Sequence, residues 1–126
     1  MNGGIRVLLI DDEVDFLEVT AKRLERRGYL VDTAETCADA LRALGERGVD
    51  VVVLDVMLPD RDGLECLKDI RGEHPGSAVI LLTGHASMRA GMASLDLGAS
   101  DYCLKPVDLD ELVDRIEIVY RDSRAG

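Results

Sequence analysis

Five short apolar runs alternate along the chain with segments in which apolar residues recur every three or four positions. The runs predict strands at Ile5–Ile10, Tyr29–Thr33, Val49–Leu54, Ala78–Leu82 and Tyr102–Leu104. The first, third and fourth runs are continuously aliphatic, which is typical of parallel strands that are covered on both faces. The second and fifth are shorter and more polar, so we expect them at the edges of a sheet.

The segments between the runs have the spacing of amphipathic helices. Five of them are marked by the apolar pairs Val14 with Leu17, Leu41 with Leu44, Leu64 with Leu67, Met88 with Met92, and Leu109 with Leu112. Strands that alternate with helices form a parallel sheet through right-handed crossovers. With the first strand in the centre, the sequence predicts an α/β fold, a doubly wound five-stranded parallel sheet in the flavodoxin-like order 2-1-3-4-5.

The length of 126 residues suits a single domain with a hydrophobic core of its own. We expect this domain to cover residues 1–126, with its core in 5–120 and a polar, frayed tail at 121–126. The apolar runs are too short to span a bilayer, and Asp11-Asp12-Glu13 interrupts the first of them. We therefore expect neither a membrane span nor a signal peptide.

The composition is acidic, since fifteen Lys and Arg stand against twenty-five Asp and Glu for a net charge of −10. A surface of this sign repels phosphate backbones and anionic lipids. We therefore expect no direct binding of nucleic acid or of a membrane by this domain.

Three cysteines, Cys37, Cys66 and Cys103, make an odd number and have no CxxC spacing. We expect them to be small buried side chains in a reducing compartment, rather than members of a disulfide framework or a zinc site. Neither His74 nor His85 has a cysteine or a second histidine at the spacing of a metal ligand.

Polar residues follow four of the predicted strands where each strand ends, namely Asp11 and Asp12, Asp55, Thr83 and Lys105. In the predicted order the first and third strands are neighbours, and a ligand crevice opens at their carboxyl ends. Three carboxylates placed together favour a bound cation, and an oxygen-only cluster suits Mg²⁺ or Mn²⁺ better than zinc. A lysine and a threonine hydroxyl opposite them would bind an anion, so the site suits a phosphoryl group.

With these residues in place, the chain resembles the receiver domain of bacterial two-component response regulators, the chemotaxis-regulator-like fold. The matching stretches are LLIDDE, VVVLDVMLPDRDGLE, VILLTGHA and GASDYCLKP, and the resemblance covers residues 5–120. It implies a phosphoprotein that takes a phosphoryl group from a sensor histidine kinase or a phosphotransfer protein and then changes its partner-binding face. Such a domain is a signalling switch with self-catalysed phosphotransfer and autodephosphorylation, not a metabolic enzyme.

The resemblance also implies roles for single residues. Asp55 would be the phosphoacceptor, and Mg²⁺ would be held by Asp11, Asp12, Asp55 and the backbone carbonyl of Met57. Thr83 would donate a hydrogen bond to one phosphoryl oxygen.

Further roles concern the fifth predicted strand and the loop after the fourth. Lys105 would pair with another phosphoryl oxygen, and its peptide bond to Pro106 would be cis. Tyr102 would be the aromatic switch residue that responds to Thr83. His85, together with Met57, would tune the lifetime of the acyl phosphate.

For partners, the resemblance implies the kinase, a downstream effector or an attached output domain, and a role in transcription regulation. It implies a cytoplasmic protein that is a monomer or a phosphorylation-dependent homodimer. The stretches LTGHA and GASDYCLKP are most similar to receivers that precede ATPase-type transcription activators.

Several alternatives stay open on the residues alone. Asp55 could be an ordinary turn carboxylate, Tyr102 ordinary edge-strand packing, and His85 an exposed loop histidine. We expect Glu13 to cap the first helix, and Asp60 and Asp62 to be solvated turn residues.

Three other functions are the rivals of the phosphorylated switch. A Mg²⁺-dependent aspartyl phosphatase would need a second carboxylate two residues after Asp55, where this chain has Met57. A flavin-binding module would need a Ser/Thr/Gly-rich loop after the first strand, where this chain has Asp-Asp-Glu. A degenerate receiver that serves only as an interaction scaffold is the remaining alternative.

Overall fold

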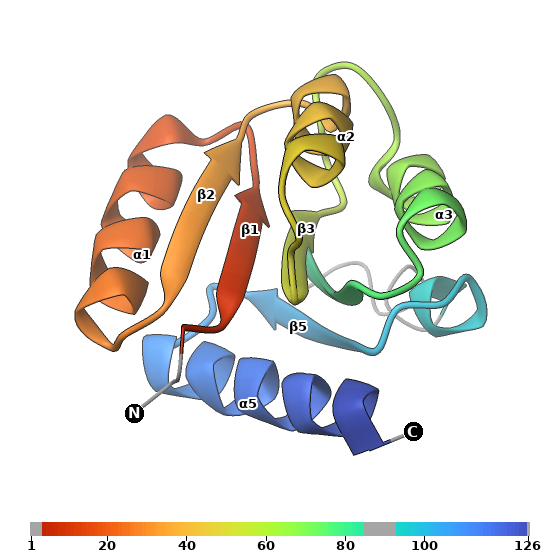
Figure 1. Ribbon diagram of the computed structural model, residues 1–126. Coiled ribbons are helices and arrows are strands. Elements are labelled where there is room, and N and C mark those ends of the chain that lie inside the picture. Colours follow the sequence, from red (N-terminus) through yellow and green to blue (C-terminus); the bar gives the residue numbers. More distant parts are fainter. Residues whose placement is uncertain (1–3, 85–92, 126) are drawn as a thin grey trace.

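The predicted strands form one parallel sheet. The computed structural model describes residues 4–84 and 93–125 and has the strands β1 (Arg6–Ile10), β2 (Leu30–Ala34), β3 (Val51–Asp55), β4 (Ala78–Gly84) and β5 (Asp101–Lys105) (Figure 1). Every neighbouring pair of strands is parallel, and their order is β2-β1-β3-β4-β5. The predicted fold class and strand order are confirmed.

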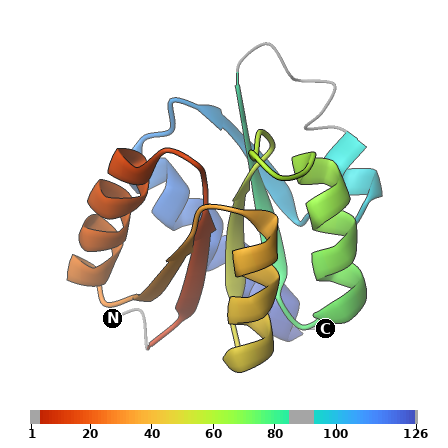
Figure 2. The ribbon, with the colours of Figure 1, turned by 90° about the horizontal axis from the view of Figure 1, so that it is seen from above.

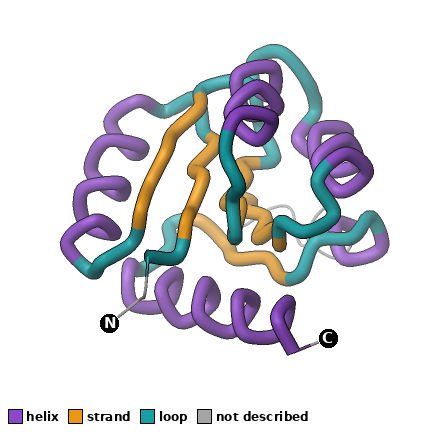
Figure 3. Tube along the Cα trace, in the orientation of Figure 1, coloured by secondary structure: helices purple, strands orange, loops and turns teal. Residues whose placement is uncertain are grey.

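Helices cover both faces of this sheet. They are α1 (Val14–Arg26), α2 (Cys37–Glu46), α3 (Gly63–Glu73) and α5 (Leu109–Ala125), and residues 93–96 are also helical. The alternation of helices and strands along the chain is followed most easily in Figure 3. The predicted helical residues Met88 and Met92 lie outside the described residues. Within the described ranges, no helix combines the length and the apolar character needed to cross a bilayer.

The helices are divided between the two faces by side-chain contacts. α1 and α5 lie on one face of the sheet, and α2 and α3 lie on the other (Figure 2). The buried residues of each pair of helices pack against the face that the pair covers. In β1, Val7 and Leu9 point to the α1 and α5 side, and Leu8 and Ile10 point to the other side. Because successive side chains alternate between two buried faces, the central strands must be aliphatic at every position.

The predicted helix faces are correct in outline and differ in detail. In α1 the buried residues are Leu17, Thr20 and Leu24. Val14 is 44% exposed, because it is the first residue of α1 and lies at the end of the helix rather than over the sheet. The helix ends at a basic last turn, after which Gly28 adopts a positive φ of 96°.

The expected frayed tail is instead the last turn of α5, which stays helical through Ala125. Arg124 donates to a carboxylate oxygen of Asp50 at 2.8 Å and lies over the ring of Tyr120 at 4.7 Å. These contacts tie the end of α5 to the start of β3 and to its own preceding turn.

The expectation of three unpaired cysteines is wrong, because Cys37 and Cys66 form a disulfide. The two residues are 29 positions apart in the sequence, but α2 and α3 pack side by side on the same face, and the two Cα atoms are 5.9 Å apart. Cys103 is free and buried on the opposite face, as expected.

Candidate functional site

Three aspartates meet at the carboxyl edge of the two central strands. Ile10 of β1 lies beside Leu54 of β3, so the next residues along the chain, Asp11 and Asp55, reach the same rim. One carboxylate oxygen from each of Asp11, Asp12 and Asp55 lies within 4.8 Å of the others. The predicted acidic cluster is therefore brought together by the strand register.

Two of these carboxylates are buried and held by the backbone. Asp11 is 1% exposed and Asp55 is 5% exposed, whereas Asp12 is exposed. Asp11 Oδ1 accepts a hydrogen bond from the backbone N–H of Glu13 at 2.9 Å, and Asp55 Oδ1 accepts one from that of Met57 at 3.2 Å. Each buried carboxylate thus has one oxygen fixed by the chain that follows it and a second oxygen directed to the site.

Lys105 faces these second oxygens from the end of β5. Its Nζ lies 2.6 Å from Asp11 Oδ2 and 3.4 Å from Asp55 Oδ2. The same ammonium lies 3.3 Å from Glu13 Oε1 and 5.0 Å from the centroid of the Phe16 ring. The peptide bond from Lys105 to the following proline is cis. Lys105 therefore supplies positive charge between two buried carboxylates.

The pKa of Asp55 is raised above its ordinary value, first because burial disfavours the charged form. The hydrogen bond from Met57 and the charge of Lys105 oppose this rise, and the negative charge of Asp11 adds to it. Burial by itself lowers the pKa of Lys105, but its hydrogen bond to Asp11 and the charges of both buried aspartates outweigh that effect, so the pKa is raised. The cluster accordingly stabilises a cation in its centre.

The remaining predicted residues lie on the next strands of the sheet. Thr83 is fully buried at the end of β4, beside Leu104 of β5, and its Oγ1 donates to the Gly84 carbonyl at 2.8 Å. Tyr102 is partly buried and packs against the core on the α2 and α3 side. Met57 follows β3 and is 74% exposed, while His85 lies outside the described residues.

Two further residues, Glu13 and Phe16, belong to the site beyond those predicted from the sequence. Glu13 is the N-cap residue of α1, as predicted, but its side chain makes no capping hydrogen bond. Its carboxylate instead pairs with Lys105. Phe16 lies one turn further along α1 and carries the ring beneath the same ammonium. The unbroken acidic run from Asp11 to Glu13 was the signal for Glu13, but nothing in the sequence alone marked Phe16.

In the loop after Asp55, Asp60 and Asp62 make hydrogen bonds to the neighbouring helices and are not merely solvated turn residues. Asp60 accepts hydrogen bonds from the backbone N–H groups of Cys37 and Ala38, at 3.0 and 3.1 Å. Asp62 caps α3 by accepting from the N–H of Leu64 at 2.9 Å. Both aspartates are exposed, as expected, yet each fixes the start of a helix.

The donor atoms of the acidic cluster fit a hydrated divalent cation. All of them are carboxylate oxygens, which hard cations such as Mg²⁺ prefer. Asp12 is exposed, so water can complete the coordination of a cation on that side. The residues present therefore agree with the oxygen-ligated metal that the sequence predicts.

Comparison with known proteins identifies the family. The family model described as the response regulator receiver domain matches residues 7–117. Among curated proteins, KdpE of Mycobacterium tuberculosis is 41% identical over 120 residues, and the probable transcriptional regulatory protein TcrX of the same species is 38% identical over 117. These matches cover 95% and 93% of this chain, which spans about half the length of each relative (53% and 50%).

Solved structures show the same fold over almost the whole chain. A CheY-like receiver domain protein from Methanospirillum hungatei is 31% identical, with a TM-score of 0.91 and coverage of 97% of this chain and 98% of that one. NtrX from Brucella abortus has a TM-score of 0.92 at 31% identity, and the match covers 97% of this chain but 28% of NtrX. By sequence and by fold, this chain belongs to the receiver domains of two-component response regulators.

Proposed function

We propose that Asp55 is the phosphoacceptor of a two-component phosphorelay and takes its phosphoryl group from a sensor histidine kinase or a phosphotransfer protein. The observation that carries this proposal is the position of Lys105 Nζ, 2.6 Å from Asp11 and 3.4 Å from Asp55. Phosphoryl transfer needs a nucleophile and positive charge beside it. The buried carboxylate of Asp55 can supply the first, and Lys105, together with a cation held at the exposed Asp12, can supply the second.

In the proposed transfer, Asp55 Oδ2 attacks the phosphorus in line with the leaving nitrogen of the phosphohistidine. Oδ1 stays bonded to the N–H of Met57, which orients the attacking oxygen. Lys105 is close enough to pair with a phosphoryl oxygen, since it already lies 3.4 Å from Asp55. Thr83 would turn its hydroxyl from the Gly84 carbonyl to a second phosphoryl oxygen.

We propose Mg²⁺, or Mn²⁺, as the cofactor, held by Asp11, Asp12, Asp55 and the backbone carbonyl of Met57. When bound, this ion would neutralise the charge of the phosphoryl oxygens. The carboxylate oxygens within 4.8 Å of one another support this assignment. Lys105 would then leave Asp11 for the phosphoryl group, which carries about two negative charges.

The proposed output is a change of the face formed around β5 and α5. Thr83 and Tyr102 lie on adjacent strands, two register positions apart. In this proposal, a movement of the threonine toward a phosphoryl group changes how the tyrosine ring packs. The curated relatives are named transcriptional regulatory proteins and are about twice as long as this chain. We therefore propose a cytoplasmic switch, monomeric or dimerising on phosphorylation, that regulates transcription through an attached or separate output domain.

Phosphorylation with a small donor tests this function. The protein is incubated with acetyl phosphate and MgCl₂, and its intact mass is measured. We expect one phosphate adduct that requires Mg²⁺ and is lost in Asp55→Asn. The matched control, Asp122→Asn, changes an exposed aspartate near the end of α5 and should keep the adduct.

Two results would overturn the proposal. An absent adduct on the wild-type protein would favour a degenerate receiver that acts as an interaction scaffold. An undiminished adduct on Asp55→Asn would place the phosphoacceptor elsewhere.

A further inference from the structure

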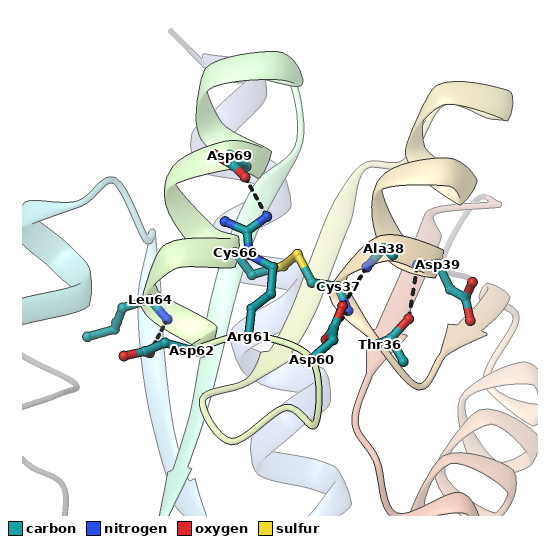
Figure 4. Close-up of a disulfide and its surroundings, with 10 residues drawn as sticks. All are labelled: Thr36, Cys37, Ala38, Asp39, Asp60, Arg61, Asp62, Leu64, Cys66 and Asp69. Atoms are coloured by element: carbon teal, nitrogen blue, oxygen red, sulfur yellow. Dashed lines mark hydrogen bonds and ion pairs between the residues drawn. A yellow bond between two sulfur atoms is a disulfide. The ribbon is translucent and has the colours of Figure 1, made fainter.

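The Cys37–Cys66 disulfide lies at the edge of the phosphorylation-site loop. Cys37 is the first residue of α2, and Cys66 lies in the first turn of α3. Both are fully buried, and Figure 4 shows their sulfur atoms bridging the two helices. The bond is a covalent link between two elements that otherwise contact each other only through side-chain packing.

Of the three cysteines of the chain, the fold brings only Cys37 and Cys66 to the same face of the sheet. α2 and α3 cover the same face of the sheet, so Cys37 and Cys66 share one apolar cluster. Cys103 belongs to the cluster on the opposite face, with the whole sheet between it and the other two thiols. Burial also raises the pKa of the Cys103 thiol to about 11, so this thiol is poorly nucleophilic near neutral pH.

The loop between Asp55 and α3 is fastened to both of the bridged helices. Asp60 accepts from the first two N–H groups of α2, those of Cys37 and Ala38. At the other end, the N–H of Gly63 donates to the Val56 carbonyl at 2.8 Å. Figure 4 shows the loop passing between the two helix starts, directly beside the disulfide. Any change in the spacing of α2 and α3 must therefore pull on this loop.

We propose that Cys37 and Cys66 are a reversible oxidation site, and that their disulfide clamps α2 to α3 and restrains the loop of residues 56–62. A small disulfide is the oxidant. One cysteine thiolate attacks a sulfur of the oxidant and releases one thiol, and the other cysteine then attacks the mixed disulfide and releases the second. Two protein thiols become one disulfide, and the two electrons reduce the oxidant to two thiols. A dithiol reductant reverses the exchange.

Because both sulfur atoms are buried, thiol–disulfide exchange at Cys37 and Cys66 should be slow. Exchange requires the first turn of α2 to open, and the surface position of that turn allows it, because Glu35, Ala38 and Asp39 are exposed. After closure, the bond is shielded from reductants in solution. The site should consequently respond over minutes to hours rather than act as an instantaneous sensor.

Peptide mapping tests the pairing. The protein is reduced, incubated with oxidised glutathione, alkylated with iodoacetamide in denaturant and digested with trypsin. We expect peptides 28–42 and 62–68 to be joined, and Cys103 to carry the only alkyl group. The variant Cys103→Ala should give the same joined peptides, whereas Cys66→Ala should give none. Three alkylated cysteines after oxidation, or a bond that includes Cys103, would overturn the proposal.

Hydrogen exchange and thermal unfolding of the reduced and the oxidised wild-type protein test whether the disulfide restrains α2, α3 and the loop of residues 56–62. Closing a loop of 29 residues should raise the Tm of the oxidised form on the order of 10 °C. Amides of 37–40 and 56–66 should exchange more slowly in the oxidised form, and the variant Cys37→Ala/Cys66→Ala should respond to neither oxidant nor reductant. Equal exchange in both forms would disprove the clamp. Since no step uses phosphorylation, this outcome is separate from failure of the proposed function.

Discussion

Lys105 shows how one side chain can serve two states of a site. Its ammonium lies among the oxygens of Asp11, Glu13 and Asp55, and two of these three acids belong to the cluster that would hold a metal ion. Opposite charges at this distance attract strongly in a partly buried site. Lys105 therefore stabilises the acidic cluster when no cation is bound, and competes with a cation for the same oxygens.

Because Lys105 competes with a cation but also serves the phosphoryl group, its replacement should strengthen Mg²⁺ binding and slow phosphorylation. In Lys105→Met, Mg²⁺ should bind about tenfold more tightly, because a competing positive charge has been removed. The same variant should form phosphate adduct more slowly, because the phosphoryl group loses its cationic partner. Mg²⁺ affinity is measured from the rise of Tm with MgCl₂, and adduct formation by intact mass.

Lys22→Met is the matched control, since Lys22 is an exposed lysine of α1. It should leave both measurements unchanged. Weaker Mg²⁺ binding in Lys105→Met would contradict the proposed role of this lysine.

Gly63 determines how α3 begins after the phosphorylation-site loop. A Cβ at this position would lie 2.5 Å from both Cα and O of Val56 and 2.7 Å from O of Asp55. These are backbone atoms, so they cannot move aside without shifting the loop. The close approach of α3 to the end of β3 thus depends on a residue without a side chain.

A pair of glycine substitutions in α3 tests this dependence. Gly63→Ala should lower the free energy of unfolding by about 3 kcal/mol, because the new methyl group overlaps the backbone. Gly72→Ala, in the same helix, has no atom within 4 Å of the added Cβ and should raise that free energy by about 0.5–1 kcal/mol. Urea denaturation measures both. Equal effects of the two substitutions would contradict the steric argument.

The elements themselves were largely predictable from sequence, and the reason is the burial of the sheet. Runs such as Val51–Leu54 must be aliphatic at every position because both faces are covered. The same logic placed Asp11, Asp55 and Lys105 at one rim, since parallel strands end on the same side.

Side-chain contacts between residues that are far apart in the sequence were not predictable in this way. Nothing in the local sequence of Cys37 indicates that Cys66 lies beside it, because that contact arises from how α2 and α3 pack on the finished sheet. Glu13 has the local features of a helix cap, but a lysine that comes 92 residues later attracts its carboxylate. The polar end of α5 is tied down by an ion pair between Arg124 and Asp50, two residues that are 74 positions apart in the sequence.

At the scale of the molecule, Tyr29 ties α5 to the segment between α1 and β2. Its hydroxyl donates to a carboxylate oxygen of Glu117 at 2.6 Å, over a separation of 88 residues. Burial first, and then this hydrogen bond and the charge of Glu117, raise the pKa of Tyr29 above its ordinary value of 10. The neutral phenol is thus favoured by the folded protein.

This shift predicts a loss of stability at alkaline pH. As the pH rises above about 10, Tyr29 ionises in the unfolded chain before it ionises in the folded protein, so its contribution declines. Below that pH the contribution is fully present. Tyr29→Phe should cost about 1–2 kcal/mol at pH 7 and should lose less stability than wild type between about pH 9 and pH 11.

Urea denaturation across this pH range measures the effect. Tyr120→Phe is the control, because it leaves Tyr29 and its bond to Glu117 in place and should follow the wild-type decline. A wild-type decline that persists unchanged in Tyr29→Phe would show that this residue is not its source.

Chemical trapping can identify the residue that carries the phosphoryl group, which we propose is Asp55. The protein is phosphorylated with acetyl phosphate and MgCl₂, reduced with borohydride, which converts an aspartyl phosphate to homoserine, and mapped by mass spectrometry. We predict homoserine at position 55 alone, and none when MgCl₂ is omitted. Homoserine at Asp11, Asp12 or any other aspartate, or none at position 55, would show that Asp55 is not the phosphoacceptor.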